Sequence, residues 1–212
     1  MADQLHHEPL PLAPPVPAGT VLVRQGDPAA PARIVVTGAL LERAVTCEGR
    51  VLVPSLPGPG DLVGSTEAAP SPVTVIALRR TVLRRAATHE VAAGIARREA
   101  RALALAADIA WVDAAARVEA RLREIAAIHG RPAAGGGLAV GLTLTQEDLA
   151  ALAGTTRESA NRAVRSMIAA GLLDRTARGR YVLRSPLRSV GEDEGPARPG
   201  RHRSGAIGNP IA

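Results

Sequence analysis

The segment GTTRESANRAVRSM (residues 154–167) is the part of the chain whose residue types and spacing most clearly suggest chemistry. At helical spacing, Arg157, Glu158 and Arg162 lie away from the apolar side that contains Val164. An arginine fork can bind the O6 and N7 atoms of guanine, and a carboxylate can accept a hydrogen bond from cytosine N4. The segment is therefore predicted to read G·C base pairs in duplex DNA. The alternative is a helix whose charges are simply solvated.

The secondary structure predicted around this segment favours a DNA-reading helix over a helix whose charges are simply solvated. Thr145 and Asp148 lie three residues apart, as at the start of a helix, and Thr155 and Glu158 repeat this spacing before a second helix. Residues 172–184 predict a hairpin. Helix, turn, helix and hairpin together are typical of a winged helix-turn-helix domain, whose second helix enters the major groove.

Other polar side chains of this domain are expected to contact the DNA backbone, which positions a protein on the duplex without reading its sequence. The expected backbone contacts are Thr145, Thr156, Asn161, Arg165, Arg178 and Arg180. The whole chain supports a polyanionic partner, because its 26 basic residues, all arginine, exceed its 20 acidic residues and give a formal net charge of +6. A GC-rich genome would produce the same arginine bias.

The composition argues against several other functions. The chain has one tryptophan, one tyrosine and no phenylalanine, so it lacks the aromatic platform on which single-stranded nucleic acids usually stack. Its one cysteine, Cys47, cannot form an intramolecular disulfide or hold an iron–sulfur cluster, and no cofactor or metal site is expected. No catalytic motif occurs, so no enzyme activity is predicted. Without a signal peptide or a membrane-spanning apolar run, the protein is predicted to be cytoplasmic.

Changes in composition along the chain predict its domain organisation. The expected regions are a flexible Pro-rich arm (1–18), an antiparallel β domain (19–85), a long helix (86–112), a winged helix-turn-helix domain (113–185) and a disordered tail (186–212). Short Val, Leu and Ile runs between glycine turns indicate the β domain, and an alanine-rich stretch without proline indicates the helix. The two ends have too little apolar surface to offset the entropy lost on ordering.

A heptad pattern in the long helix predicts a parallel homodimer. Apolar residues recur at alternating spacings of four and three, as in a helix that pairs with its own copy across a two-fold axis. The expected interface residues are Val91, Ile95, Leu105, Ile109 and Val112. The alternative is that the stripe packs against the helix's own domain, because Arg98 and several alanines interrupt it.

These features together resemble the cyclic-AMP receptor protein/FNR (CRP/FNR) family of bacterial transcription regulators. The segments VLVRQGDPA, IVVTGALLE, EGRVLV and PGDLVG are similar to the glycine-punctuated strands of the family, and TTRESANR is similar to its recognition helix. The resemblance covers Gly19 to Leu183. It implies an α+β chain with an antiparallel β-roll of the cyclic-nucleotide-binding type (a double-stranded β-helix), a dimerisation helix and a winged helix-turn-helix.

The same resemblance implies how such a protein would work. Arg157, Glu158 and Arg162 would hold the base-reading positions, on palindromic sites with TGTGA-like half-sites. The implied partners are double-stranded DNA and a second copy of the chain, with RNA polymerase and a small-molecule effector as further candidates. No membrane partner is expected.

The cyclic-nucleotide pocket departs from the family pattern. PGDLVG is followed by STEAAPSPVTVIAL, so Ser65 stands where nucleotide-binding members have the ribose-binding glutamate, and Ser71 where they have the phosphate-binding arginine. The degenerate pocket is expected to contain Ser65, Glu67, Ser71 and Thr74. Because no nearby residue replaces that arginine, and a buried phosphate without a cation is strongly disfavoured, usual binding of cyclic AMP or cyclic GMP is not expected.

Several alternatives are compatible with these residues. The β-roll could respond to a cyclic nucleotide in an unusual manner or to a different small ligand, or the dimer could bind DNA without any ligand. A non-specific, nucleoid-type protein whose arginines contact only phosphates would also fit the charge.

Overall fold

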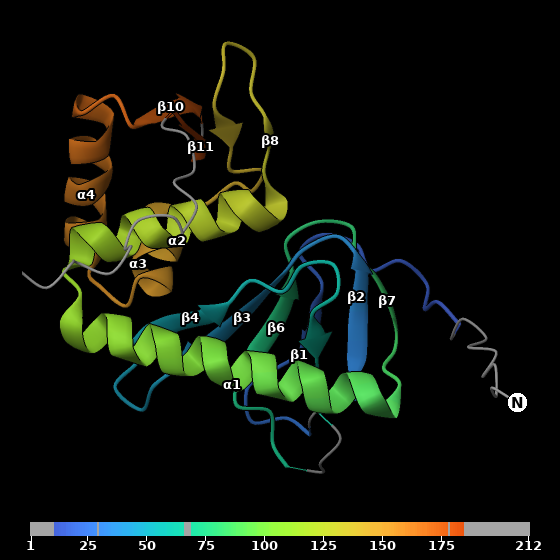
Figure 1. Cartoon of the computed structure of the whole chain (residues 1–212). Coiled ribbons are helices and arrows are strands. Elements are labelled where there is room, and N and C mark those ends of the chain that lie inside the picture. The colour runs from blue at the N-terminus through green and yellow to red at the C-terminus, as the bar shows by residue number, and fades with distance from the viewer. Residues whose placement is uncertain (1–10, 29, 66–68, 178, 185–212) are drawn as a thin grey trace, which may run out of the picture.

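The N-terminal part of the chain is an antiparallel β domain (Figure 1), seen in a computed structural model that describes residues 11–28, 30–65, 69–177 and 179–184. Its strands are β1 (Val21–Val23), β2 (Arg33–Thr37), β3 (Leu40–Val45), β4 (Val51–Ser55), β5 (Leu62–Val63), β6 (Thr74–Ala77) and β7 (Val82–Arg85). One sheet has the order β1-β6-β3-β4 and the other β5-β2-β7. Alternate side chains of these strands point to a common interior, where Val35, Leu40 and Leu83 are fully buried.

Residues 11–18 correct the expectation that a flexible arm extends to residue 18. Val16 N donates to Thr81 O at 2.7 Å and Thr81 N donates back to Val16 O at 2.9 Å. Val16 also packs against the apolar core of the β domain. Backbone pairing beside β7 therefore orders this segment, although its composition alone is that of a flexible arm. Residues 1–10 and the predicted tail, 186–212, lie outside the described residues.

Two helices, α1 (Thr88–Trp111) and α2 (Ala114–His129), connect the β domain to the C-terminal domain (Figure 1). α1 packs along the β domain, and a Cβ at Gly94 would lie 2.4 Å from Leu62 Cβ, so this glycine permits the close approach of α1 to β5. Asp113 lies between the two helices and is the N-cap of α2. Its carboxylate accepts hydrogen bonds from two backbone N–H groups of the first turn.

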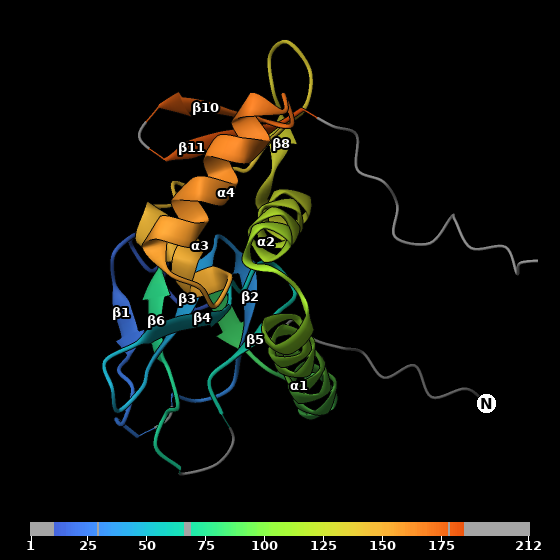
Figure 2. The same ribbon diagram turned by 90° about the vertical axis from the view of Figure 1, so that its left-hand side faces the viewer.

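The C-terminal domain consists of α2, two shorter helices and a small sheet, and Figure 2 shows α4 in front of it. The added elements are β8 (Arg131–Pro132), β9 (Leu138–Ala139), α3 (Gln146–Leu152), α4 (Arg157–Ala169), β10 (Leu173–Ala177) and β11 (Arg180–Leu183). Strands β10 and β11 form the expected hairpin within a sheet of order β10-β11-β9-β8. Tyr181, the one tyrosine of the chain, is 1% exposed in the core beneath them.

The two domains share one continuous apolar cluster. Leu41 and Val53 of the β domain belong to the same cluster as Leu122 of α2 and Leu149 of α3. His129, buried at the end of α2, adds a polar contact across this junction, with its Nε2 atom 3.3 Å from Leu56 O. The helices of the C-terminal domain are therefore packed against the β domain.

The predicted α+β class, with an antiparallel β-rich domain followed by helices and a winged helix-turn-helix, is confirmed. Among the described residues, no helix is both long and apolar enough to cross a membrane.

Candidate DNA-binding surface

Local capping fixes where the two helices of the helix-turn-helix begin. Thr145 Oγ1 accepts from Asp148 N at 3.0 Å, and Asp148 Oδ2 accepts from Thr145 N at 2.8 Å, as the spacing predicts for the start of α3. The start of α4 differs by one residue: Thr156, and not Thr155, is the N-cap, and its Oγ1 accepts from Ser159 N at 3.2 Å. Glu158 is therefore not the capping partner, although as an acid in the first turn of α4 it still interacts favourably with the helix dipole.

α4 has one buried side and one charged side. Its buried residues are Ala160, Ala163, Val164 and Met167, which pack against α2, α3 and the small sheet. Arg157, Glu158, Arg162 and Arg165 are exposed on other sides of the helix. Apolar packing of one side thus fixes the direction in which the charged side faces, as expected for an amphipathic helix.

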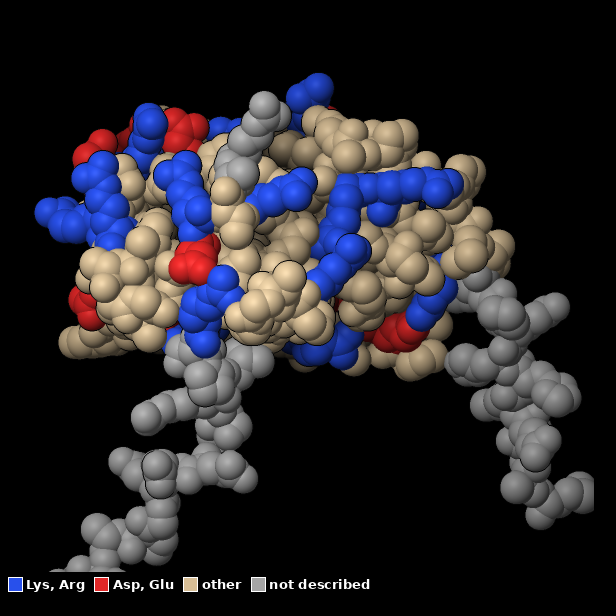
Figure 3. All heavy atoms as spheres, turned by 90° about the horizontal axis from the view of Figure 1, so that it is seen from above, with Lys and Arg blue, Asp and Glu red and all other residues tan. Residues whose placement is uncertain are grey.

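Within the part of the chain that the structure describes, the exposed charges of α4 are not neutralised by ion pairs. Among the described residues, Arg157, Arg162 and Arg165 form no ion pair. Figure 3, which looks onto the molecule from above, shows more basic than acidic side chains on the face turned to the viewer. Unpaired guanidinium groups on one face can contact phosphates or base edges.

Arg157 also borders a cavity of about 560 Å³ between the β domain and α3. Leu41 and Val53 form part of its apolar wall, and Glu147 and Asp148 part of its polar side. The Arg157 side chain must therefore extend away from this cavity to reach a base.

The predicted backbone contacts lie around α4 and the hairpin. They are placed at the two helix N-termini (Thr145 and Thr156), on α4 (Asn161 and Arg165) and at the start of β11 (Arg180). Asn161 is half-buried, whereas Arg165 and Arg180 are exposed. Arg178 lies outside the described residues. Contact of these residues with DNA stays a prediction.

Arg117 of α2 holds the turn of the helix-turn-helix, and sequence reasoning missed it. Its Nε donates to Ala153 O at 2.7 Å and its Nη2 to Gly154 O at 3.2 Å, while Nη1 donates to Val112 O at the end of α1. One side chain thus ties the α3–α4 turn to the end of α1. No sequence pattern indicates this role, because the three carbonyls come together only in the folded chain.

The structure changes the interpretation of the heptad stripe on α1. Leu105 is 4% exposed because it packs within its own chain. The prediction that this residue lies in a dimer interface is therefore wrong. Val91 lines a cavity of the β domain, and Ile109 packs beside Gly154. Val112 lies beyond the last residue of α1, as its C-cap. Leu105 and Val91 thus face the helix's own domain, whereas Ile95, Ile109 and Val112 are 41%, 40% and 37% exposed, so their place in a dimer interface stays a prediction.

The predicted ligand pocket is a cavity of about 240 Å³ in the β domain, bordered by α1. Ser65 and Ser71 line it, and the Ser71 hydroxyl donates to Val73 O at 2.7 Å. Thr74 does not line it, because alternation along β6 places Thr74 on the opposite face from the lining residue Val75. Glu67 lies outside the described residues.

Two charged residues of this cavity were not predicted. Glu42 of β3 and Arg98 of α1 both line it, and Arg98 Nη2 lies 3.2 Å from Glu42 Oε1. The expectation that no cation replaces the arginine of nucleotide-binding members is therefore wrong in part, since Arg98 reaches the cavity from α1. Glu42, however, already balances its charge. The two residues are distant in sequence, so only the packing of α1 on the β domain reveals the pair.

Comparison with known proteins identifies both the domain and the fold. Residues 116–188 match the Crp-like helix-turn-helix domain. No curated protein sequence matches the chain. A CRP/FNR-family transcriptional regulator from Thermus thermophilus has the same fold, with a TM-score of 0.73 and 21% identity over 82% of this chain and 94% of that chain.

Two further solved structures have the same fold as this chain. The c-di-GMP-responsive global regulator CLP of Xanthomonas campestris gives a TM-score of 0.70 and 21% identity, over 84% of this chain and 95% of that chain. FixK2 from Bradyrhizobium japonicum gives 0.67 and 22%, over 89% of this chain and 99% of that chain. The chain therefore has the fold of regulators of the CRP/FNR type, and the resemblance seen in the sequence is confirmed.

Proposed function

We infer that this chain, which combines the CRP/FNR fold with a Crp-like helix-turn-helix domain, is a transcription regulator that reads specific sequences in duplex DNA. The observation that carries this proposal is the surface of α4. Arg157, Glu158 and Arg162 are exposed near the start of the helix, on a scaffold fixed by buried residues on the other side. Side chains in this part of a recognition helix reach base edges in the major groove, where arginine and carboxylate groups distinguish G·C pairs.

The second part of the proposal is a parallel homodimer formed by an exposed stripe of α1 that keeps Ile95 of the predicted interface and leaves out the buried Leu105. Leu103 is 73% exposed and Ile95 is 41% exposed. With small neighbours they form an exposed apolar stripe on α1: Ile95, Ala102, Leu103, Ala106 and Ala110. Burial of such a stripe against a second copy would remove apolar surface from water.

This arrangement would also place the two recognition helices together. In Figure 1, α4 lies above the C-terminal end of α1. A two-fold axis along α1 would therefore bring both α4 helices to the same end of the dimer. Palindromic half-sites about one helical turn apart, roughly 34 Å, would match this geometry.

Alanine substitutions in α4 test the base-reading roles. Arg157→Ala and Arg162→Ala should each weaken binding to a selected palindrome by about 1–3 kcal/mol and relax its sequence preference, because each removes a bidentate contact to guanine. Selection from random duplexes, followed by titration at fixed salt, measures both effects. Arg24→Ala is the matched control, since it removes an exposed arginine of the β domain far from α4 in the chain.

Arg165→Ala separates phosphate contacts from base contacts. It should weaken the selected palindrome and a shuffled duplex about equally, because a phosphate contact carries no sequence information. If the wild-type chain binds both duplexes equally, with one salt dependence, it is a non-specific nucleoid-type protein and the regulator proposal fails.

Regulation by cyclic AMP or cyclic GMP in the usual manner is not part of the proposal. The cavity holds a buried carboxylate, and its one described cation is already paired with it. A phosphate would have to displace that carboxylate from Arg98 in a poorly solvated site. We propose RNA polymerase as a partner and the cytoplasm as the location of the protein. The only basis for both is that a transcription regulator acts on the chromosome.

A further inference from the structure

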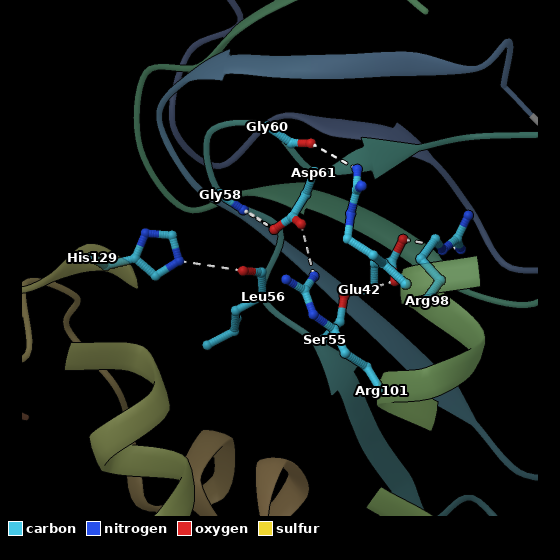
Figure 4. A network of polar contacts seen from close by, with 10 residues as sticks. Glu42, Ser55, Leu56, Gly58, Gly60, Asp61, Arg98, Arg101 and His129 are labelled. Atoms are coloured by element: carbon cyan, nitrogen blue, oxygen red, sulfur yellow. Dashed lines mark hydrogen bonds and ion pairs between the residues drawn. The ribbon is translucent and has the colours of Figure 1, made fainter. Parts of the chain in front are cut away.

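His129 is a buried histidine at the contact between the two domains. It ends α2, it is 5% exposed, and its Nε2 atom lies 3.3 Å from Leu56 O in the β4–β5 loop, residues 56–61 (Figure 4). A carbonyl oxygen only accepts hydrogen bonds, so the neutral ring carries its proton on Nε2 and donates it to Leu56. A side chain of the C-terminal domain is thus bonded to the backbone of the β domain.

The 56–61 loop packs closely on the end of α2. A Cβ at Gly58 would lie 2.7 Å from Ile128 Cγ2 and 2.9 Å from His129 Cε1. The cavity that His129 lines has a volume of about 20 Å³, which is room for about one water molecule. A site with so little water disfavours the charged form of a histidine.

The acids near His129 are already paired with other cations. Asp61, in the 56–61 loop, is paired with Arg101 of α1 at 2.8 Å (Figure 4). Glu124, which lines the same small cavity as His129, is paired with Arg121 at 2.5 Å. A proton on the ring would therefore gain little from either carboxylate.

Arg79, in the β6–β7 turn, is a cation near His129 with no acid of its own. Among the described residues it forms no ion pair, its Nε atom is buried without a hydrogen-bond acceptor, and Arg131 is a second cation close to it. Burial lowers the pKa of His129, and the hydrogen bond to Leu56 raises it. The charge of Arg79 lowers this pKa further, and that of Asp61 raises it. A protonated ring would add another positive charge beside Arg79.

We propose that His129 makes the contact between the two domains sensitive to acid: protonation of its ring beside Arg79 releases the 56–61 loop from α2. The neutral ring needs only the bond to Leu56 O, whereas a protonated ring carries a second N–H, on Nδ1, which has no hydrogen-bond partner among the described residues. Release would give this N–H access to water. The inference goes beyond the proposed DNA-binding function and does not depend on it.

The direction of the pH dependence follows from the lowered pKa of His129. Well above pH 6.5, the ordinary pKa of histidine, the ring is neutral whether the contact is closed or open, and the contact keeps its full strength. Below that pH, the open arrangement binds a proton that the closed one does not, so the contact weakens. An accessible ring is about nine-tenths protonated at pH 5.5, so the open population should rise by up to roughly tenfold between pH 7.5 and pH 5.5.

Hydrogen–deuterium exchange of the full-length chain without DNA tests the proposal. After correction for intrinsic rates, the protection of residues 56–61 and 126–130 should fall threefold or more between pH 7.5 and pH 5.5, because the contact opens more often. The protection of β7, in the core of the β domain, should change by less than twofold. Equal protection of residues 56–61 at both pH values, or a parallel loss in β7, would overturn the proposal.

His129→Gln separates protonation from packing. The glutamine Nε2 group can still donate to Leu56 O but does not titrate, so the protection of residues 56–61 should differ by less than twofold between the two pH values. A fall of threefold or more in this variant would assign the acid sensitivity to another group and refute the role of His129. His89→Gln removes an exposed histidine at the start of α1 and is the matched control, which should keep the wild-type fall.

Arg79→Met tests the cation and decides the question if His129→Gln does not fold. Without this charge the protonated ring is less disfavoured in the closed contact, so the fall in protection should be at most half the wild-type factor. Arg80→Met, which removes the exposed neighbouring cation, should keep the wild-type fall. Equal falls in these two variants would overturn the proposal. Because DNA is absent from all these measurements, a negative result leaves the DNA-binding proposal untouched.

Discussion

Gly154, in the turn between α3 and α4, is predicted to be a position where a single methyl group disturbs the recognition helix. Its φ is +56°, a conformation that costs an L-residue roughly 1–2 kcal/mol. A Cβ at this position would lie 2.6 Å from Ile109 Cδ1 and 2.8 Å from Ile109 Cγ1. Forcing extra atoms into a packed contact costs about 1–3 kcal/mol, and the partly exposed Ile109 can give way, so the lower half of that range applies.

Gly154→Ala should therefore lower the free energy of unfolding by roughly 2–4 kcal/mol, the sum of backbone strain and the contact with α1. Urea unfolding followed by far-ultraviolet circular dichroism measures this loss. Gly171→Ala is the matched control: Gly171 has φ of +70°, but a Cβ there would meet nothing within 4 Å. It should lose only the strain, roughly 1–2 kcal/mol.

A double-mutant cycle isolates the contact with α1. In an Ile109→Ala background, Gly154→Ala should cost no more than Gly171→Ala, because the side chain that the new methyl group would meet has been shortened. Equal losses for the two glycine variants in the wild-type background would refute the steric part of the reasoning. A loss that persists unchanged with Ile109→Ala would show that the turn and α1 are not in this contact.

Leu105→Ala should lower the free energy of unfolding by about 2–4 kcal/mol, because Leu105 is buried within the chain, and urea titration measures this. Leu103→Asp should leave the subunit folded but dissociate the proposed dimer, as light scattering would show; a dimer that survives would remove Leu103 from the interface. Arg84 and the Ala87 N–H hold the pKa of Glu90 at about 2, below its ordinary 4.5, so Glu90 stabilises the fold above about pH 5 and this contribution is lost as the pH falls towards 2. Denaturation of Glu90→Gln between pH 2 and pH 6 should show a weaker pH dependence than wild type, and an identical dependence would contradict the assignment.

The amino-acid sequence alone determined the features that depend on neighbours along the chain. The spacing of Thr145 and Asp148 fixed the start of α3, and the apolar period of residues 157–169 fixed which side of α4 is buried. These features could be predicted because hydrogen bonds and side-chain contacts three or four residues apart follow from helix geometry. The family resemblance of the same segment led to the correct fold.

Only the tertiary structure decided which residues each apolar or charged helix face contacts. The heptad spacing that contains Leu105 predicted a dimer interface, but Leu105 is buried within its own chain, because heptad spacing reports an apolar face and not the surface that covers it. The ion pair of Glu42 with Arg98 and the contacts of Arg117 with the turn join residues that are distant in sequence. No local pattern encodes such contacts, since they exist only after α1 has packed against the β domain and α2 against α3 and α4.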